Sequence, residues 1–143
     1  MTMEDLAHHI IGIAQEKNLP ITNLQLQKVM FFSLKDAIIN HRFSESALMR
    51  IYDKPFLVWR YGPVEKDIYD EYRIYGADPI IEPNKPNSDF ESLNEKIISL
   101  LEEDPFELVQ QSHDETFWRE HESAIDGWRS SVPYSLRDVG EIN

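Results

Sequence analysis

The sequence predicts a mainly α fold, with about five or six helices in one compact domain and at most a small two-stranded β element around residues 49–60. The length of 143 residues matches that of a single domain, 1–143, that can bury a hydrophobic core of its own. Apolar residues recur at helical spacing in several segments. Between residues 40 and 62 this period is lost, and aromatic and branched side chains dominate.

The first predicted helix spans residues 3–17. Thr2 can cap its first turn, which carries acidic residues, and apolar side chains recur every three or four positions along it. His8 and His9 are adjacent and point about 100° apart, so they cannot form a metal-binding pair on one helix face. We expect both at the surface or at the boundary of the core.

The second predicted helix begins after Thr22, which with Gln25 matches a capping box. Its apolar residues cover more than half of the circumference, which predicts a central position in the domain. Gln27 falls on the apolar side, so its amide is expected to bond to a neighbouring backbone, although contact with a ligand is an alternative. Phe32 lies at the edge of the polar stripe. That stripe is formed by Gln25, Lys28, Lys35 and Asp36.

The middle of the chain predicts two short extended segments, 49–52 and 56–60. Gly62-Pro63 is typical of a helix start, because the missing N–H of proline is unpaired at the first helical position in any case. The helix predicted from there to Gly76 places an inward stripe on one face. The stripe consists of Val64, Ile68, Tyr72 and Tyr75.

The second half of the chain predicts a proline-rich loop over residues 77–88, followed by short helices. Ser88 and Glu91 match a capping box for a helix to about residue 103, and Asp104-Pro105 matches another helix start. The remaining predicted elements are a helix to about 111, a short helix near 116–124 and a helical turn opened by Pro133.

The net charge of −12 argues against direct binding of nucleic acid, because the chain carries no basic patch to attract phosphates. The same charge is compatible with a basic protein partner. The absence of cysteine excludes disulfides and a cysteine nucleophile and fits a reducing compartment. No apolar run reaches the length of a membrane span and the start lacks a signal-peptide pattern, so we expect a cytoplasmic protein that does not bind membranes.

Few residues offer catalytic chemistry. No serine lies in a nucleophile-elbow context and no glycine-rich phosphate loop is present. The metal-capable residues between His113 and His121 are one open alternative, a metal-dependent enzyme. These two histidines are eight positions apart, so the favoured interpretation is an acidic loop with solvated or capping histidines. We therefore expect no enzyme activity, no catalytic residue, no metal and no cofactor.

Three segments together resemble one family: "ITNLQLQKVMFFS" at 21–33, "IYDKPFLVWRYGPVEKDIYDEY" at 51–72 and "LVQQSHDETFW" at 108–118. They are similar to the Panacea domain, the SocA-like antitoxin family also described as phage-associated or GepA-like proteins. The chain departs from the family pattern at Ser112 and Phe117. The signature positions are Leu26, Gln27, Lys28, Trp59, Tyr61, Gly62, Pro63, Val64, His113, Glu115 and Trp118.

The resemblance implies a helical antitoxin of a type II-like toxin–antitoxin system, which neutralises a cognate protein toxin encoded nearby by direct binding. It also implies that some members deliver the toxin to an ATP-dependent protease. The signature positions are expected to hold the fold together. Candidate partner contacts are Phe32, Trp128 and Tyr134, together with the loop at 77–88 and the tail after Trp128. An alternative is a phage accessory protein that binds a host factor.

Overall fold

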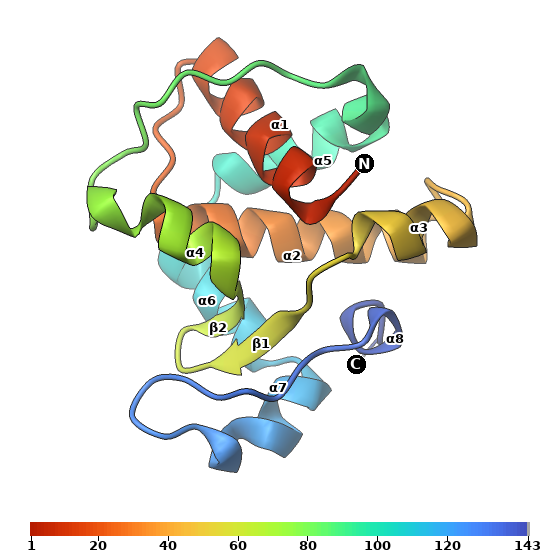
Figure 1. The fold of residues 1–143 in the computed structure, drawn as a ribbon, viewed down its shortest axis with the longest axis vertical. Coiled ribbons are helices and arrows are strands. Elements are labelled where there is room, and N and C mark those ends of the chain that lie inside the picture. The colour runs from red at the N-terminus through yellow and green to blue at the C-terminus, as the bar shows by residue number, and fades with distance from the viewer. Residues whose placement is uncertain (143) are drawn as a thin grey trace.

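The computed structural model describes residues 1–142 and confirms the mainly α fold with one small sheet (Figure 1). The α-helices of the described residues are α1 (Met3–Glu16), α2 (Asn23–Ile39), α3 (Glu45–Ile51), α4 (Lys66–Tyr72), α5 (Asn94–Leu101), α6 (Pro105–His113), α7 (Thr116–His121) and α8 (Leu136–Val139). The two antiparallel strands are β1 (Phe56–Trp59) and β2 (Gly62–Glu65). Short 3-10 turns are η1 (Arg73–Tyr75), η2 (Ser88–Leu93) and η3 (Glu122–Ala124).

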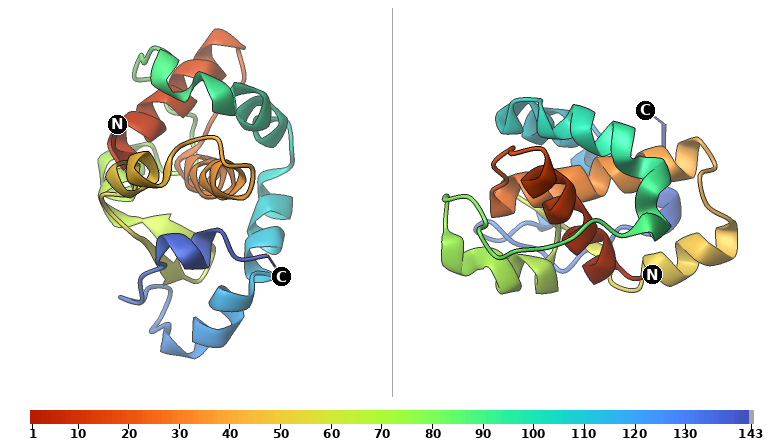
Figure 2. Two further views of the ribbon diagram at one scale, coloured as in Figure 1. Left: turned by 90° about the vertical axis from the view of Figure 1, so that its right-hand side faces the viewer. Right: turned by 90° about the horizontal axis from the view of Figure 1, so that it is seen from above.

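Helix α2 runs through the middle of the molecule, as its broad apolar surface predicts. Figure 2 shows it end-on, with α1 and α5 on one side and the β1–β2 hairpin on the other. It contacts α1, α5, α6, β2, α4 and α8, so elements from the start, the middle and the end of the chain pack against this one helix. Every residue of α2 up to Ile38 is therefore buried or half-buried.

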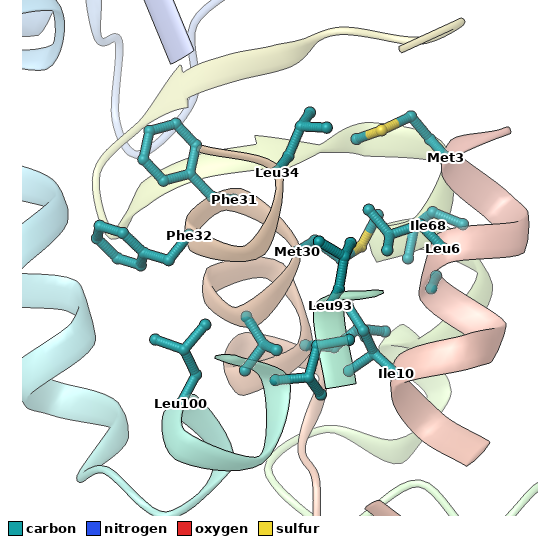
Figure 3. Packing of buried hydrophobic residues seen from close by; sticks show 14 of the residues in the cluster. Met3, Leu6, Ile10, Met30, Phe31, Phe32, Leu34, Ile68, Leu93 and Leu100 are labelled. Atoms are coloured by element: carbon teal, nitrogen blue, oxygen red, sulfur yellow. The ribbon is translucent and has the colours of Figure 1, made fainter. Parts of the chain in front are cut away.

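The core forms where α1, α2 and α5 meet (Figure 3). Leu6 and Ile10 of α1 point toward Met30 of α2, Met3 points toward Leu34, and Leu93 lies between the helices. These side chains are excluded from water, and burying each stabilises the fold by about 1.5–3 kcal/mol.

The predicted helix starts follow the capping pattern in part. Thr2 and Asp5 form a complete capping box on α1, and Thr22 accepts the N–H of Gln25 at 3.2 Å. The second half of the predicted box at Thr22 is wrong, because the Gln25 amide donates to the Leu101 carbonyl instead. The box predicted at residue 88 is also wrong, since the preceding residue, Asn87, caps a 3-10 turn there.

The hairpin is the main correction to the predicted middle of the chain. Residues 49–51 belong to α3, and the partner of β1 is Gly62–Glu65, with Trp59 opposite Gly62. The helix predicted to start at Gly62-Pro63 starts four residues later. The carboxylate of Glu65 accepts the N–H groups of Asp67 and Ile68, so it caps α4 in place of a proline start.

The C-terminal tail adds a third extended segment alongside β1. The N–H of Val58 donates to the carbonyl of Val132 at 3.0 Å, and the N–H of Tyr134 donates to the carbonyl of Phe56 at 2.8 Å. Pro133 forms a bridge with Leu57 and does not open a helix. The last helical turn, α8, is capped by Ser135 instead.

The loop at 77–88 lies across α1 at Gly12, where an added Cβ would come within 2.5 Å of the Lys85 backbone. His9 of α1 is buried under this loop, which corrects its predicted position at the surface or at the boundary of the core. Its Nδ1 accepts the N–H of Asn87 at 2.8 Å, so Nε2 carries the proton and donates to Asn94 Oδ1 at 2.7 Å. Burial lowers the pKa of His9, and the bond to Asn94 partly opposes that shift.

None of the helices within residues 1–142 combines the length and the apolar character that a membrane span requires.

Candidate functional site

The amide of Gln27 joins α2 to the second strand of the hairpin. Its Oε1 accepts the N–H of Glu65 at 2.7 Å, and its Nε2 donates to the carbonyl of the same residue at 3.2 Å. The buried amide thus replaces a strand neighbour for β2, which would otherwise leave two buried backbone groups unpaired. The predicted bond of Gln27 to a neighbouring backbone is confirmed.

Lys28 is fully buried beneath the hairpin turn, although it belongs to the polar stripe of α2. Its Nζ donates to the carbonyl of Pro63 at 2.9 Å. Burial lowers the pKa of this ammonium to about 7. A Cβ added at Gly62, whose φ is +101°, would lie 2.3 Å from Ser112 Oγ and 3.0 Å from Lys28 Cε. Only glycine allows the turn to pack this tightly on α2 and α6.

The third motif contacts the same turn from the other side. The indole N–H of Trp118 donates to the carbonyl of Trp59 at 2.9 Å, and His113 Nε2 lies 2.7 Å from the carbonyl oxygen of Arg60. The imidazole of His113 stacks on Trp118 with ring centroids 4.0 Å apart. The carboxylate of Glu115 forms an ion pair with Lys35 of α2 at 2.8 Å. The three motifs therefore meet at one place in the structure, around residues 59–65.

The signature positions divide into buried and exposed residues. Leu26 and Val64 are buried in the protein, whereas the side chain of Tyr61 is 56% exposed at the tip of the hairpin. Among the candidate partner contacts, Phe32 and Tyr134 are buried, since Phe31 packs edge-on against both rings. Of these three residues only Trp128 remains at the surface, with 41% of the residue exposed, and most of the loop at 77–88 is exposed as predicted.

His113 and His121 do not form a metal centre together with other His, Asp or Glu side chains of the described chain. Each is turned toward a backbone carbonyl, His113 toward Arg60 and His121 toward Phe117 at 2.9 Å. The only three such side chains that converge within residues 1–142 are Glu4, His8 and Glu71, at the surface between α1 and α4.

A cavity of about 320 Å³ opens beside the hairpin, between the start of α2 and the end of α4. Its walls are mainly apolar and aromatic, and we call it the aromatic pocket. Tyr61 and Trp128 stand at its exposed edge, together with Arg73 of η1. The residues that line it include Asn23, Trp59, Tyr61, Tyr69, Arg73 and Trp128.

Three aromatic rings of the pocket pack edge-on, with Trp59 between Tyr69 and Trp128. Trp59 lies 5.2 Å from Tyr69 and 5.3 Å from Trp128 between ring centroids, with interplanar angles of 72° and 80°. The guanidinium of Arg129 lies 4.6 Å from the ring centroid of Trp59 and 4.4 Å from that of Trp128. Arg129 lines a neighbouring depression, so this cation braces the rings without filling the aromatic pocket.

Two polar atoms of the pocket residues have no hydrogen-bond partner within residues 1–142. They are Oδ1 of Asn23 and Nε1 of Trp59. Both residues are buried, with exposed fractions of 3% and 2%. The free energy cost of leaving one such buried group unpaired is about 1–3 kcal/mol. Both atoms lie inside the protein and are not accessible from the pocket, so their unpaired state is a local cost to stability.

The sequence analysis did not single out Asn23, Tyr69, Arg73 or Arg129. Asn23 follows a helix cap and Tyr69 follows a buried isoleucine of α4, which are ordinary positions for such residues. They become one site only because the tail returns to the hairpin, where the N–H of Arg60 donates to the carbonyl of Trp128 at 2.9 Å.

Comparisons with protein-family models, with curated proteins and with solved structures found no match to this chain. The interpretation of the site therefore depends on its own geometry and on the three sequence motifs.

Proposed function

We propose that this chain is a binding module that neutralises a protein toxin encoded beside it, as the three motifs of the Panacea-like resemblance imply. The observation that supports the proposal is the aromatic pocket, with Tyr61, Trp128 and Arg73 at its edge. Tyrosine, tryptophan and arginine are the residues most enriched among those that dominate binding energy at protein interfaces. A concave site with such an edge can accept an anchoring side chain of a partner.

The charge of the chain favours a basic toxin. A net charge of −12 speeds the encounter with a positively charged protein and repels nucleic acid and acidic partners. The pocket alone is smaller than a stable interface, which buries about 1,200–2,000 Å². The toxin is therefore expected to cover the hairpin tip and η1 as well as the pocket. Delivery of the bound toxin to an ATP-dependent protease is a further part of the proposal.

The test is co-expression of the neighbouring gene with this chain. The neighbouring product alone is expected to arrest growth, and the chain is expected to restore it. The double variant Tyr61→Ala/Trp128→Ala is expected to abolish rescue. Its thermal unfolding is measured alongside, because Trp128 packs against Trp59 and Arg129, and the single variant Tyr61→Ala removes only the largely exposed ring. Phe106→Ala removes an exposed ring of α6 that does not line the pocket, and serves as the control.

Two results would contradict the proposal. One is a neighbouring product that does not affect growth, which would favour a phage accessory protein that binds a host factor. The other is rescue by the double variant as strong as by the wild type, which would place the binding surface elsewhere. Soluble expression of both proteins is verified in each case.

A further inference from the structure

We propose that the aromatic pocket receives the C-terminal residue of a partner protein, with an apolar or aromatic side chain between the rings and the terminal carboxylate on the guanidinium of Arg73. The identity of this partner as a toxin rests on the proposed function. The preference for an apolar residue with a free carboxylate does not, because it follows from the walls and the charges of the pocket and can be measured without any partner.

The charges at the pocket differ from those of the chain as a whole. The chain has 26 acidic residues against 14 lysines and arginines, yet none of the acidic residues lines this pocket, and its single charged lining residue is Arg73. A second guanidinium, that of Arg129, lies beside the pocket, 4.4 Å from the ring centroid of Trp128. Neither cation forms an ion pair within residues 1–142. The pocket therefore presents positive charge on an otherwise acidic protein.

The net charge and the local charge act at different ranges. At physiological ionic strength, exposed charges that are more than about 8 Å apart are largely screened from each other. A carboxylate at the pocket edge therefore interacts mainly with Arg73, to which it can form two parallel hydrogen bonds. The net charge of −12 acts instead on the encounter with a whole protein. A basic protein with a free C-terminal carboxylate matches both.

The size and the walls of the pocket select one large apolar side chain. A volume of about 320 Å³ lies at the lower end of the range of ligand pockets, roughly 300–1,000 Å³. Aromatic residues dominate the walls and offer the offset or edge-on contacts that aromatic pairs prefer. They are Trp59, Tyr61, Tyr69 and Trp128.

The position of Arg73 at the pocket edge favours the end of a chain over an internal segment. In an extended segment, neighbouring side chains point to opposite faces, so an acidic residue next to the anchoring residue points away from the surface. The next residue on the same face lies about 6.5–7 Å farther along the chain. The terminal carboxylate is bonded to the same Cα as the anchoring side chain, so it stays at the pocket edge when that side chain enters. One C-terminal residue thus supplies both groups.

The test titrates the isotope-labelled chain with small probes up to millimolar concentrations, followed by NMR at physiological ionic strength. N-acetylphenylalanine carries the ring and the free carboxylate, and N-acetylphenylalaninamide lacks the charge. N-acetyl-aspartyl-phenylalaninamide carries the acid on the neighbouring residue, and adenosine monophosphate carries a different ring and anion. We expect the free acid to shift the backbone signals of Arg73 and Ala77 and the indole signal of Trp128. We expect it to bind about fivefold more tightly than the amide, and more tightly than the other two probes.

Variants separate the charge from the walls of the pocket. Arg73→Gln is expected to remove the difference between the free acid and the amide, and its exposed position allows the chain to fold. Tyr61→Ala is expected to weaken both probes, since it removes a ring from the pocket edge. The matched control is Arg137→Gln, which removes the same charge from an exposed position of α8 that does not line the pocket. This control is expected to keep the fivefold preference of the wild type.

Equal affinity for the free acid and the amide would overturn the inference, as would a preference that persists in Arg73→Gln or the absence of any shift at the pocket. Tighter binding of the aspartyl probe would place the acid inside the partner chain, and tighter binding of adenosine monophosphate would indicate a nucleotide, so each rejects a C-terminal residue as the occupant.

Because these measurements need no partner, the two proposals can fail separately. Rescue of growth without a preference for the free acid rejects only this inference. A preference for the free acid without rescue rejects the antitoxin function and leaves the pocket as a receptor for the C-terminus of another protein.

Discussion

Replacing Lys28 by methionine tests the most unusual buried group of this protein. Lys28 lies in α2 under the hairpin, with no exposed surface and a single hydrogen bond, to Pro63. Methionine keeps most of the volume of the side chain and removes the amine. The expected effect is a loss of the dependence of stability on pH between about 7 and 9.

The magnitude follows from the pKa of Lys28. Burial lowers it from 10.5 to about 7 in the folded chain, so between these values the unfolded chain binds more protons at this residue. The free energy of unfolding therefore rises with pH through this window. Each unit of pKa corresponds to about 1.4 kcal/mol, and the rise from about pH 7 to about pH 9 amounts to about 2 kcal/mol. That is a large part of the total stability of a small domain.

The assay is urea denaturation at a series of pH values between about 7 and 9. This window avoids the other groups with shifted pKa values. The pKa of His9 is lowered below 6.5, while burial raises those of Tyr52, Tyr72 and Tyr134 above 10. Burial also raises the pKa of Glu65, partly opposed by its two backbone hydrogen bonds, but carboxylates titrate in acid.

The control is Lys66→Met, which removes a half-exposed lysine of α4 and the same positive charge. This variant is expected to keep the wild-type slope of stability against pH. Lys28→Met is expected to flatten it. A wild-type stability that is level between pH 7 and 9, or a slope that persists in Lys28→Met, would refute the burial of an unprotonated amine.

Two further substitutions test the packing of the hairpin turn. Gly62→Ala is expected to lower the free energy of unfolding by about 3 kcal/mol, because it adds overlap with Ser112 to an unfavourable positive φ. Gly127→Ala, also at positive φ but with open space around it, controls for the backbone term, and equal losses in both would contradict the overlap. Trp118→Phe is expected to lower the free energy of unfolding by about 0.5–1.5 kcal/mol in urea denaturation, since it removes the hydrogen bond to the carbonyl of Trp59, and an unchanged midpoint would show that this bond is unimportant.

Local patterns predicted the helices well, because capping and apolar periodicity act between residues close in the sequence. Thr2 and Asp104 mark the starts of α1 and α6 as expected, and Gly76 ends the third predicted helix with a φ of +58°. The prediction was wrong at Gly62-Pro63, where the proline signal for a helix start competes with strand pairing. Residues 62–65 form a strand because they pair with β1 and bond to the amide of Gln27. The contact with Gln27 joins residues that are far apart in the sequence.

The sequence by itself determined a helical domain with a central second helix and an acidic surface, since composition and period are written along the chain. Only the tertiary structure decided that Lys28 lies inside, because its position on the helix is polar by period and buried by the hairpin that covers it. The same holds for the aromatic pocket. Asn23, Tyr69 and Trp128 come from distant segments, and no pattern within any one of them records that folding brings them together.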